Sequence, residues 1–288
     1  MKLHLPLSLR SALLAVLAVV SFSHVDAYPI TIDDEYGRLE NKTYAEDLEI
    51  TILENGILTI KADMTRLGGS LTTIDIYGEL VMNGGYIGYA TSSISPSAEI
   101  TIGNGGLIEM NGGYIAYAHV NYSSASAKIT VGNGGRFEMN GGYIAYADGA
   151  ALIASAEITI GNGGVFEMNG GDIAYNANTA EITIGDGGLF EMNGGNIASN
   201  SGTAEISIES GGRFEMNGGF ISSENGITIG NGGVFEMNEG HIDCDTEITI
   251  GNGGLFGMKR GYIAQTYIGG TASAEITIGS FGLFEMKG

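Results

Sequence analysis

The residues best suited to acid–base chemistry lie in one short stretch of the chain. Glu239, His241, Asp243 and Asp245 alternate with other residues, and Arg260 follows soon after them. Carboxylates beside an imidazole and a guanidinium can move protons on a sugar, as a polysaccharide-cleaving enzyme requires. This cluster predicts, as an alternative function, a polysaccharide lyase or hydrolase that uses His241. Against it, the chain has only 12 basic residues to neutralise a uronate substrate.

A second set of chemically suited residues is a recurring glutamate in the phrase Phe-Glu-Met or a close variant. It includes Glu138, Glu167, Glu191 and Glu215. If equivalent residues stack, like charges about 5 Å apart repel by roughly 1 kcal/mol in water. We expect a solvated face that prevents strands from pairing sideways, and the alternative is loosely bound calcium. No residue set predicts a certain metal site or another cofactor.

Tyrosines recur at one place in the early part of the chain, namely Tyr86, Tyr114 and Tyr143. Exposed rings with a polar tip can bind a sugar or a protein partner. Tyrosine also suits any β-sheet surface, which is the simpler explanation. A second set lies three residues further on, and strict strand alternation would turn it inward. Its members are Tyr89, Tyr117, Tyr146 and Tyr175.

All of these residues belong to an internal repeat. Its clearest copy, residues 156–174, reads AEITIGNGGVFEMNGGDIA. The first isoleucine recurs at intervals of 21 to 29 residues, at Ile50, Ile74, Ile100, Ile129, Ile158, Ile182, Ile206, Ile227, Ile248 and Ile276. Repeats of this length indicate stacked units that bury a shared core.

Each unit contains strand and turn signals. Ile-Thr-Ile and Phe-Glu-Met alternate apolar and polar residues, which is typical of strands with one buried face. Gly-Asn-Gly-Gly and Asn-Gly-Gly separate them and tolerate the positive φ of sharp turns. A left-handed hexapeptide helix would need strict six-residue spacing, which is absent. We therefore predict an all-β fold, a right-handed parallel β-helix (β-solenoid) of about ten three-strand coils.

The chain divides into three predicted segments. Residues 1–27 carry Lys2 and Arg10, an apolar run and small residues before position 28, as in a secretory signal peptide. Residues 28–48 match no copy of the repeat and predict an N-terminal cap. Residues 49–288 predict the β-solenoid repeat domain. No later segment is apolar enough to predict a membrane helix.

Composition excludes several classes of protein. The formal net charge is −21, which opposes binding to nucleic acid or to anionic lipid. One cysteine cannot form an internal disulfide, and the 49 glycines lack the three-residue period of collagen. Cationic partners and divalent metal ions remain compatible with this charge.

The phrase AEITIGNGGVFEMNGG resembles the Gly-Gly-rich repeats of secreted or surface right-handed β-helix proteins, including adhesin-like bacterial ones. The resemblance covers about residues 49–288. It implies the pectin-lyase-like superfold, which also occurs in polysaccharide lyases and in autotransporter passenger domains. It implies no particular activity, because this superfold carries many functions.

We therefore expect a protein that is secreted or displayed on a cell surface. Its expected role is structural or adhesive, with a carbohydrate or a cell-surface or matrix component as partner, and with Tyr86, Tyr114 and Tyr143 on the binding face. The alternatives are the enzyme centred on His241 and a filament subunit that associates end to end. We expect no catalytic activity, no nucleic-acid partner and no insertion into a membrane.

Overall fold

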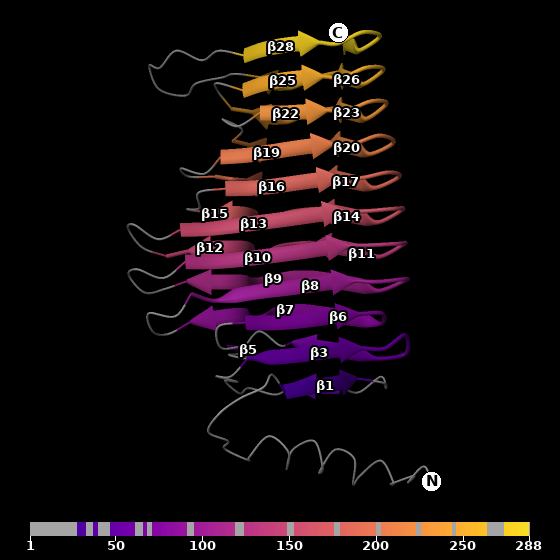
Figure 1. Cartoon of the computed structure of the whole chain (residues 1–288). Coiled ribbons are helices and arrows are strands. Elements are labelled where there is room, and N and C mark those ends of the chain that lie inside the picture. The colour runs from indigo at the N-terminus through magenta and orange to yellow at the C-terminus, as the bar shows by residue number, and fades with distance from the viewer. Residues whose placement is uncertain are drawn as a thin grey trace, which may run out of the picture.

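The structure is a computed structural model. It describes residues 28–32, 37–39, 47–60, 66–67, 71–90, 95–118, 124–148, 153–175, 179–199, 203–222, 226–243, 246–263 and 274–287. Within these ranges all regular secondary structure is β-strand. The strands stack into a column, one coil above another (Figure 1).

The first strands of the coils form one sheet of eleven parallel strands. These strands carry the Ile-Thr-Ile part of the repeat and pair in register, for example Ile158 with Ile182. In order they are β1 (Tyr28–Ile32), β3 (Leu48–Ile52), β6 (Leu71–Ile76), β8 (Ser97–Ile102), β10 (Ser124–Val131), β13 (Ile153–Ile160), β16 (Thr179–Ile184), β19 (Thr203–Ile208), β22 (Gly226–Ile229), β25 (Thr246–Ile250) and β28 (Ala274–Ile278).

The second strands carry the Phe-Glu-Met part and stack in the same way. They are β2 (Gly37–Leu39), β4 (Ile57–Ile60), β11 (Arg136–Met139), β14 (Val165–Met168), β17 (Leu189–Met192), β20 (Arg213–Met216), β23 (Val234–Met237), β26 (Leu255–Met258) and β29 (Leu283–Met286). In two coils the second and third strands are continuous, as β7 (Glu79–Ala90) and β9 (Leu107–Ala118).

The third strands are shorter and bear most of the tyrosines. They are β5 (Arg66–Leu67), β12 (Tyr143–Ala147), β15 (Asp172–Tyr175), β18 (Asn196–Ile197), β21 (Phe220–Ile221), β24 (His241–Ile242) and β27 (Tyr262–Ile263). Nine described coils thus have all three strands, and the described residues include two further coils with only the first two. The predicted fold class is confirmed.

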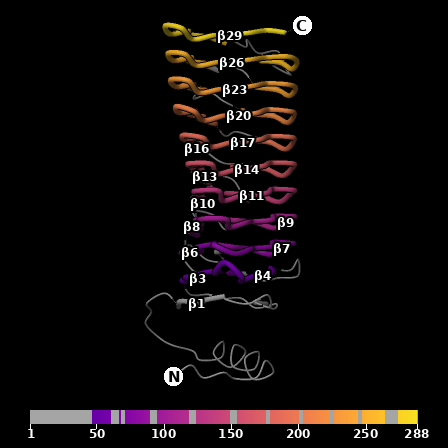
Figure 2. Tube along the Cα trace, turned by 90° about the vertical axis from the view of Figure 1, so that its right-hand side faces the viewer, coloured from indigo at the N-terminus to yellow at the C-terminus, as the bar shows by residue number. Residues whose placement is uncertain are grey.

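The coils wind right-handedly. In Figure 1 the sheet from β1 to β28 lies toward the viewer and its strands run left to right, whereas β7 and β9 run back behind it. Figure 2, seen from the right-hand side, places β3, β6, β8, β10, β13 and β16 on one side of the column and β4, β7 and β9 on the other. Because each coil also rises toward the C-terminal end, this direction of winding is right-handed.

The core is a set of columns of identical side chains. Phe137, Phe166 and the phenylalanines above them are fully buried up to Phe256, and their rings stack at 4.6–4.8 Å with interplanar angles of 3–12°. The methionines from Met82 to Met237 are also buried, and from Met139 onward each lies two residues after a phenylalanine of this column. Sulfur and ring contacts of this kind add to the hydrophobic stabilisation.

The segment before residue 48 contributes strands to the column. β1 pairs with β3 and β2 pairs with β4, both in parallel. The segment predicted as a cap therefore includes part of a further coil.

Two segments rich in alanine and serine, residues 124–127 and 153–156, also contribute to the first sheet. Residues 124–127 pair with residues 153–156 as extensions of β10 and β13. Ala125, Ala127, Ala154 and Ala156 in these extensions are buried.

Candidate binding surface

Tyr86, Tyr114 and Tyr143 form the first tyrosine column, on the outer face of the third strands. They pair in register across β7, β9 and β12. Their ring centroids are 5.0 and 5.1 Å apart, and the rings are nearly parallel, at 6° and 9°. Each side chain is half-buried. The predicted outward ladder is therefore present as a rigid stack.

Tyr89, Tyr117, Tyr146 and Tyr175 form the second tyrosine column, and the expectation that these residues point inward is wrong. Their rings stack on one another at 5.3–5.5 Å and 3–9°. They also contact the first column, since the centroids within each pair Tyr86–Tyr89, Tyr114–Tyr117 and Tyr143–Tyr146 are 4.8 Å apart. Both columns thus lie side by side on the outer face.

The backbone explains why alternation fails here. The residue just before the second tyrosine of each pair has positive φ: 68° at Gly88, 57° at Ala116 and 55° at Ala145. One residue in the left-handed region reverses the side-chain direction, so tyrosines three positions apart share a face. An alanine in this conformation is strained by roughly 1–2 kcal/mol, and Ala174 and Ala198 repeat the feature at φ 57° and 55°. Alanine, a poor residue for left-handed backbone, gave no signal of this in the sequence.

Tyr117 is the most enclosed member of the two columns, with 9% of its surface exposed. Burial raises the pKa of its phenol well above 10, and the nearby Asp148 carboxylate adds to the shift. The Tyr117 hydroxyl donates a hydrogen bond to Asp148 Oδ2 at 3.3 Å. Burial also raises the pKa values of Tyr114 and Tyr146. These phenols therefore stay neutral hydrogen-bonding groups at physiological pH.

The stacking limits what the surface can bind. A ring in the middle of a column, such as Tyr114, has both faces covered by the rings of neighbouring coils. It can offer a ligand its edge and its hydroxyl, but not its face. The sequence suggested that a sugar could stack on any ring of the ladder. The structure allows such stacking only where a column ends.

The first column continues upward with different residues. Asp172 and Asn196 take the next two positions in register, followed by Phe220, His241 and Tyr262. Asn196 Nδ2 donates to Asp172 Oδ1 at 2.7 Å, and Ser199 Oγ donates to the same oxygen at 3.3 Å. A polar pair thus separates two aromatic stretches. The sequence shows this substitution, but its contacts depend on the register of the coils.

The proposed acid–base cluster is only partly described. Asp245 lies outside the described residues, while His241 and Asp243 are half-buried and Arg260 is exposed. The ring of His241 lies 6.1 Å from that of Phe220 and 5.2 Å from that of Tyr262. Among the described residues, no group of three or more His, Cys, Asp or Glu side chains is arranged to hold a metal ion. The structure places His241 in the aromatic column.

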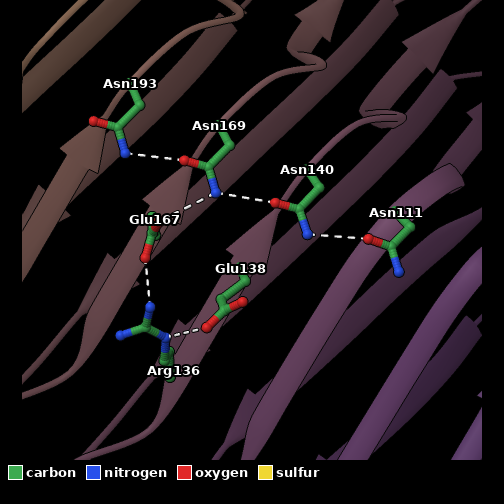
Figure 3. Close-up of polar contacts among 7 residues, drawn as sticks. All are labelled: Asn111, Arg136, Glu138, Asn140, Glu167, Asn169 and Asn193. Carbon is green, nitrogen blue, oxygen red and sulfur yellow. Dashed lines mark hydrogen bonds and ion pairs between the residues drawn. The ribbon is translucent and has the colours of Figure 1, made fainter.

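The glutamate ladder is partly neutralised by two arginines that the sequence analysis did not single out. Arg136 contacts Glu138 in its own coil and Glu167 in the coil above, both at 2.5 Å (Figure 3). Arg213 joins Glu215 and Glu236 in the same way, at 2.5 and 2.6 Å. Of the glutamates predicted to hold calcium, Glu138, Glu167 and Glu215 are thus already paired.

Beside the glutamates runs an asparagine ladder. Each amide donates to the amide oxygen of the coil below, for example Asn140 Nδ2 to Asn111 Oδ1 at 3.0 Å (Figure 3). The series continues through Asn169, Asn193, Asn217 and Asn238. Such ladders link successive coils and fix their register.

The last described coil has an exposed apolar face. The exposed fractions are 49% for Ile278, 47% for Leu283 and 70% for Met286. End-to-end association through such an edge stays a prediction. None of the described segments is a helix long and apolar enough to cross a membrane.

No family model matches the chain, and no curated protein matches it. A solved structure that it resembles is the crystal structure of the TibC-catalyzed hyper-glycosylated TibA55-350 fragment. The identity is 16% and the TM-score 0.22, over 90% of this chain and 92% of that one. The fold assignment rests on the strand pairing of this chain and not on that similarity.

Proposed function

We propose that this protein is secreted or displayed on a cell surface and acts as a structural or adhesive binding protein. Its partner is a carbohydrate or a cell-surface or matrix component. The binding face is the pair of tyrosine columns. The observation that carries the proposal is the side-by-side packing of Tyr86, Tyr114 and Tyr143 with Tyr89, Tyr117, Tyr146 and Tyr175.

Physical reasons support this face as a binding surface. Tyrosine offers apolar area and a hydrogen-bonding tip with few rotatable bonds, so ordering it on binding costs little entropy. Here the rings are already fixed by stacking and by the strand ladders beneath them, which lowers that cost further. The net charge of −21 disfavours polyanionic partners and favours neutral or cationic ones.

The test is a binding and turnover assay on the same samples. The purified chain is incubated with neutral and acidic polysaccharides and with extracellular matrix preparations, and both retained protein and newly released chain ends are measured. We expect retention without cleavage, weakened in the double variant Tyr114→Ala/Tyr143→Ala. Tyr77→Ala is the matched control, because Tyr77 is 42% exposed and lies outside both columns.

The outcomes separate the proposal from its alternative. Equal retention of the double variant and the Tyr77→Ala control would exclude the tyrosine columns as the binding face. Cleavage that disappears in His241→Ala, with an unchanged melting temperature, would support the polysaccharide-processing enzyme instead.

A further inference from the structure

The second tyrosine column ends one coil above the first. In the first column Asp172 and Asn196 follow Tyr143, and an aromatic side chain returns only at Phe220. In the second column Tyr175 is the last ring, because the same register places Ser199 one coil above it. The coils from Tyr143 to Phe220 span about 14 Å along the axis.

At the upper end of the second column, one ring face has no described ring stacked on it. One face of Tyr175 stacks on Tyr146 at 5.3 Å and 9°. Its other face points toward the coil of Ser199, and among the described residues no ring stacks on it. Tyr175 also contacts the ring of Tyr143 edge to face at 5.8 Å. Its ring is therefore held rigidly with one face turned to a position that carries a small side chain.

A fixed hydrogen-bond acceptor lies next to this ring. Asp172 is three residues before Tyr175 on β15, and both side chains are half-buried. Its two hydrogen bonds, from Asn196 and Ser199, both end on Oδ1. These donors hold the carboxylate in one orientation, and no described residue donates to Oδ2. Oδ2 is thus available to a donor outside the chain.

We infer that Tyr175, Asp172, Asn196 and Ser199 form a subsite for one hexose unit of a neutral polysaccharide. The apolar face of the sugar packs on the open face of Tyr175, and sugar hydroxyls donate to Asp172 Oδ2. This combination of an aromatic platform with a few oriented polar groups is suited to a polar ligand with an apolar face. The net charge of −21 selects against uronates.

This inference rests on the proposed function, since it locates the carbohydrate contact within the tyrosine face. The subsite can also be distinguished by experiment from a broad binding surface that covers both tyrosine columns. A broad surface depends on every tyrosine of the columns, whereas this subsite depends on the upper end alone. Tyr86, at the lower end of the first column, distinguishes the broad surface from the subsite, and Tyr77, which is 42% exposed and lies outside both columns, is the control.

The experiment is calorimetric titration of the purified chain with cellohexaose, laminarihexaose, maltohexaose and mannohexaose, with trigalacturonate as the charged control. We compare the unmodified chain with Tyr175→Ala, Asp172→Asn, Tyr86→Ala and the control Tyr77→Ala. The melting temperature of each variant is measured to confirm folding. Asp172→Asn preserves the size of the side chain but removes the charge.

We expect at least one neutral hexasaccharide to bind and trigalacturonate not to bind. Tyr175→Ala and Asp172→Asn should each weaken binding about tenfold or more, because each removes a buried or oriented contact. Tyr77→Ala should stay within about twofold of the unmodified chain, and Tyr86→Ala should weaken binding less than Tyr175→Ala does.

Other outcomes overturn the inference. Equal losses in Tyr175→Ala and Tyr86→Ala would leave the broad tyrosine surface intact and exclude the subsite. Binding of no hexasaccharide, together with tyrosine-dependent retention on a whole polysaccharide or matrix preparation, would also exclude it. No tyrosine-dependent binding in either assay would refute both the subsite and the proposed function.

Discussion

Replacing Gly195 with alanine should destabilise the solenoid strongly, because the glycine turn between the second and third strands has no room for a Cβ atom. Gly195 has φ +85°, and a Cβ there would lie 2.5 Å from the carbonyl oxygen of Gly171 and 2.6 Å from Met168 Cε. The methyl end of Met168 can move, but the Gly171 carbonyl belongs to the coil below and is fixed by the strand ladders. The substitution therefore has two separate free-energy costs, one from the backbone conformation and one from the steric clash.

The magnitude follows from those two costs. An L-residue forced to positive φ is destabilised by roughly 1–2 kcal/mol. Overpacking against a fixed neighbour adds about 1–3 kcal/mol. We expect Gly195→Ala to lower the free energy of unfolding of its coil by about 2–5 kcal/mol.

Two control variants separate the costs. Gly163 has φ +70°, but a Cβ there would lie 3.9 Å from its nearest neighbour, so Gly163→Ala should lose only the backbone contribution of about 1–2 kcal/mol. Gly161 lacks a positive φ, and a Cβ there would also have its nearest neighbour at 3.9 Å, so Gly161→Ala should be neutral or slightly stabilising.

The assay is calorimetric melting combined with hydrogen exchange, because a repeat array can unfold coil by coil. Faster exchange in Gly195→Ala should be centred on the coils of Gly171 and Gly195. Equal destabilisation by Gly195→Ala and Gly163→Ala would refute the reasoning, since the clash would then contribute nothing.

Three further predictions concern the charged and titrating groups. Arg136→Gln should lower the free energy of unfolding by about 0.5–1 kcal/mol, and added salt should reduce the difference, because the ion pairs of Arg136 are exposed; an effect that persists at high salt would contradict this. Because the folded pKa of Tyr117 is raised, the unfolded chain loses its proton first as the pH rises above 10, so stability should fall there. Denaturation in Tyr117→Phe should show a shallower fall, and equal slopes would exclude the effect. Millimolar calcium should raise the melting temperature more than sodium at equal ionic strength, and Glu191→Gln should reduce the difference; identical shifts would exclude calcium binding.

Much of the fold could be predicted from the sequence because most copies of the repeat have the same pattern of strand and turn residues. Alternation in Ile-Thr-Ile and Phe-Glu-Met sets which side chains are buried, and the regular return of Phe166 and Phe190 implies stacking. The asparagine ladder follows from the same repetition, since equivalent residues of successive coils are neighbours.

The outward position of Tyr117 could not be predicted in this way. It depends on the left-handed backbone at Ala116, a residue that rarely adopts that conformation. The packed coil imposes the conformation, and the gain from burying Ile115 and Ala118 in the core while the two tyrosine columns pack together offsets the strain. Interactions between coils therefore override the local preference.

A column of stacked identical rings limits ligand binding, because each ring covers the face of its neighbour. For ligand specificity, the position where the columns end therefore matters more than the stacked rings within them. Each added tyrosine covers a face of the ring below it, so a longer ladder gains rigidity and loses ring faces available to a ligand. Only a substitution by small or polar residues, as at Asp172, Asn196 and Ser199, restores a face and adds directional hydrogen bonds. In a solenoid whose scaffold is built by repetition, specificity for a ligand is therefore expected where the repetition stops.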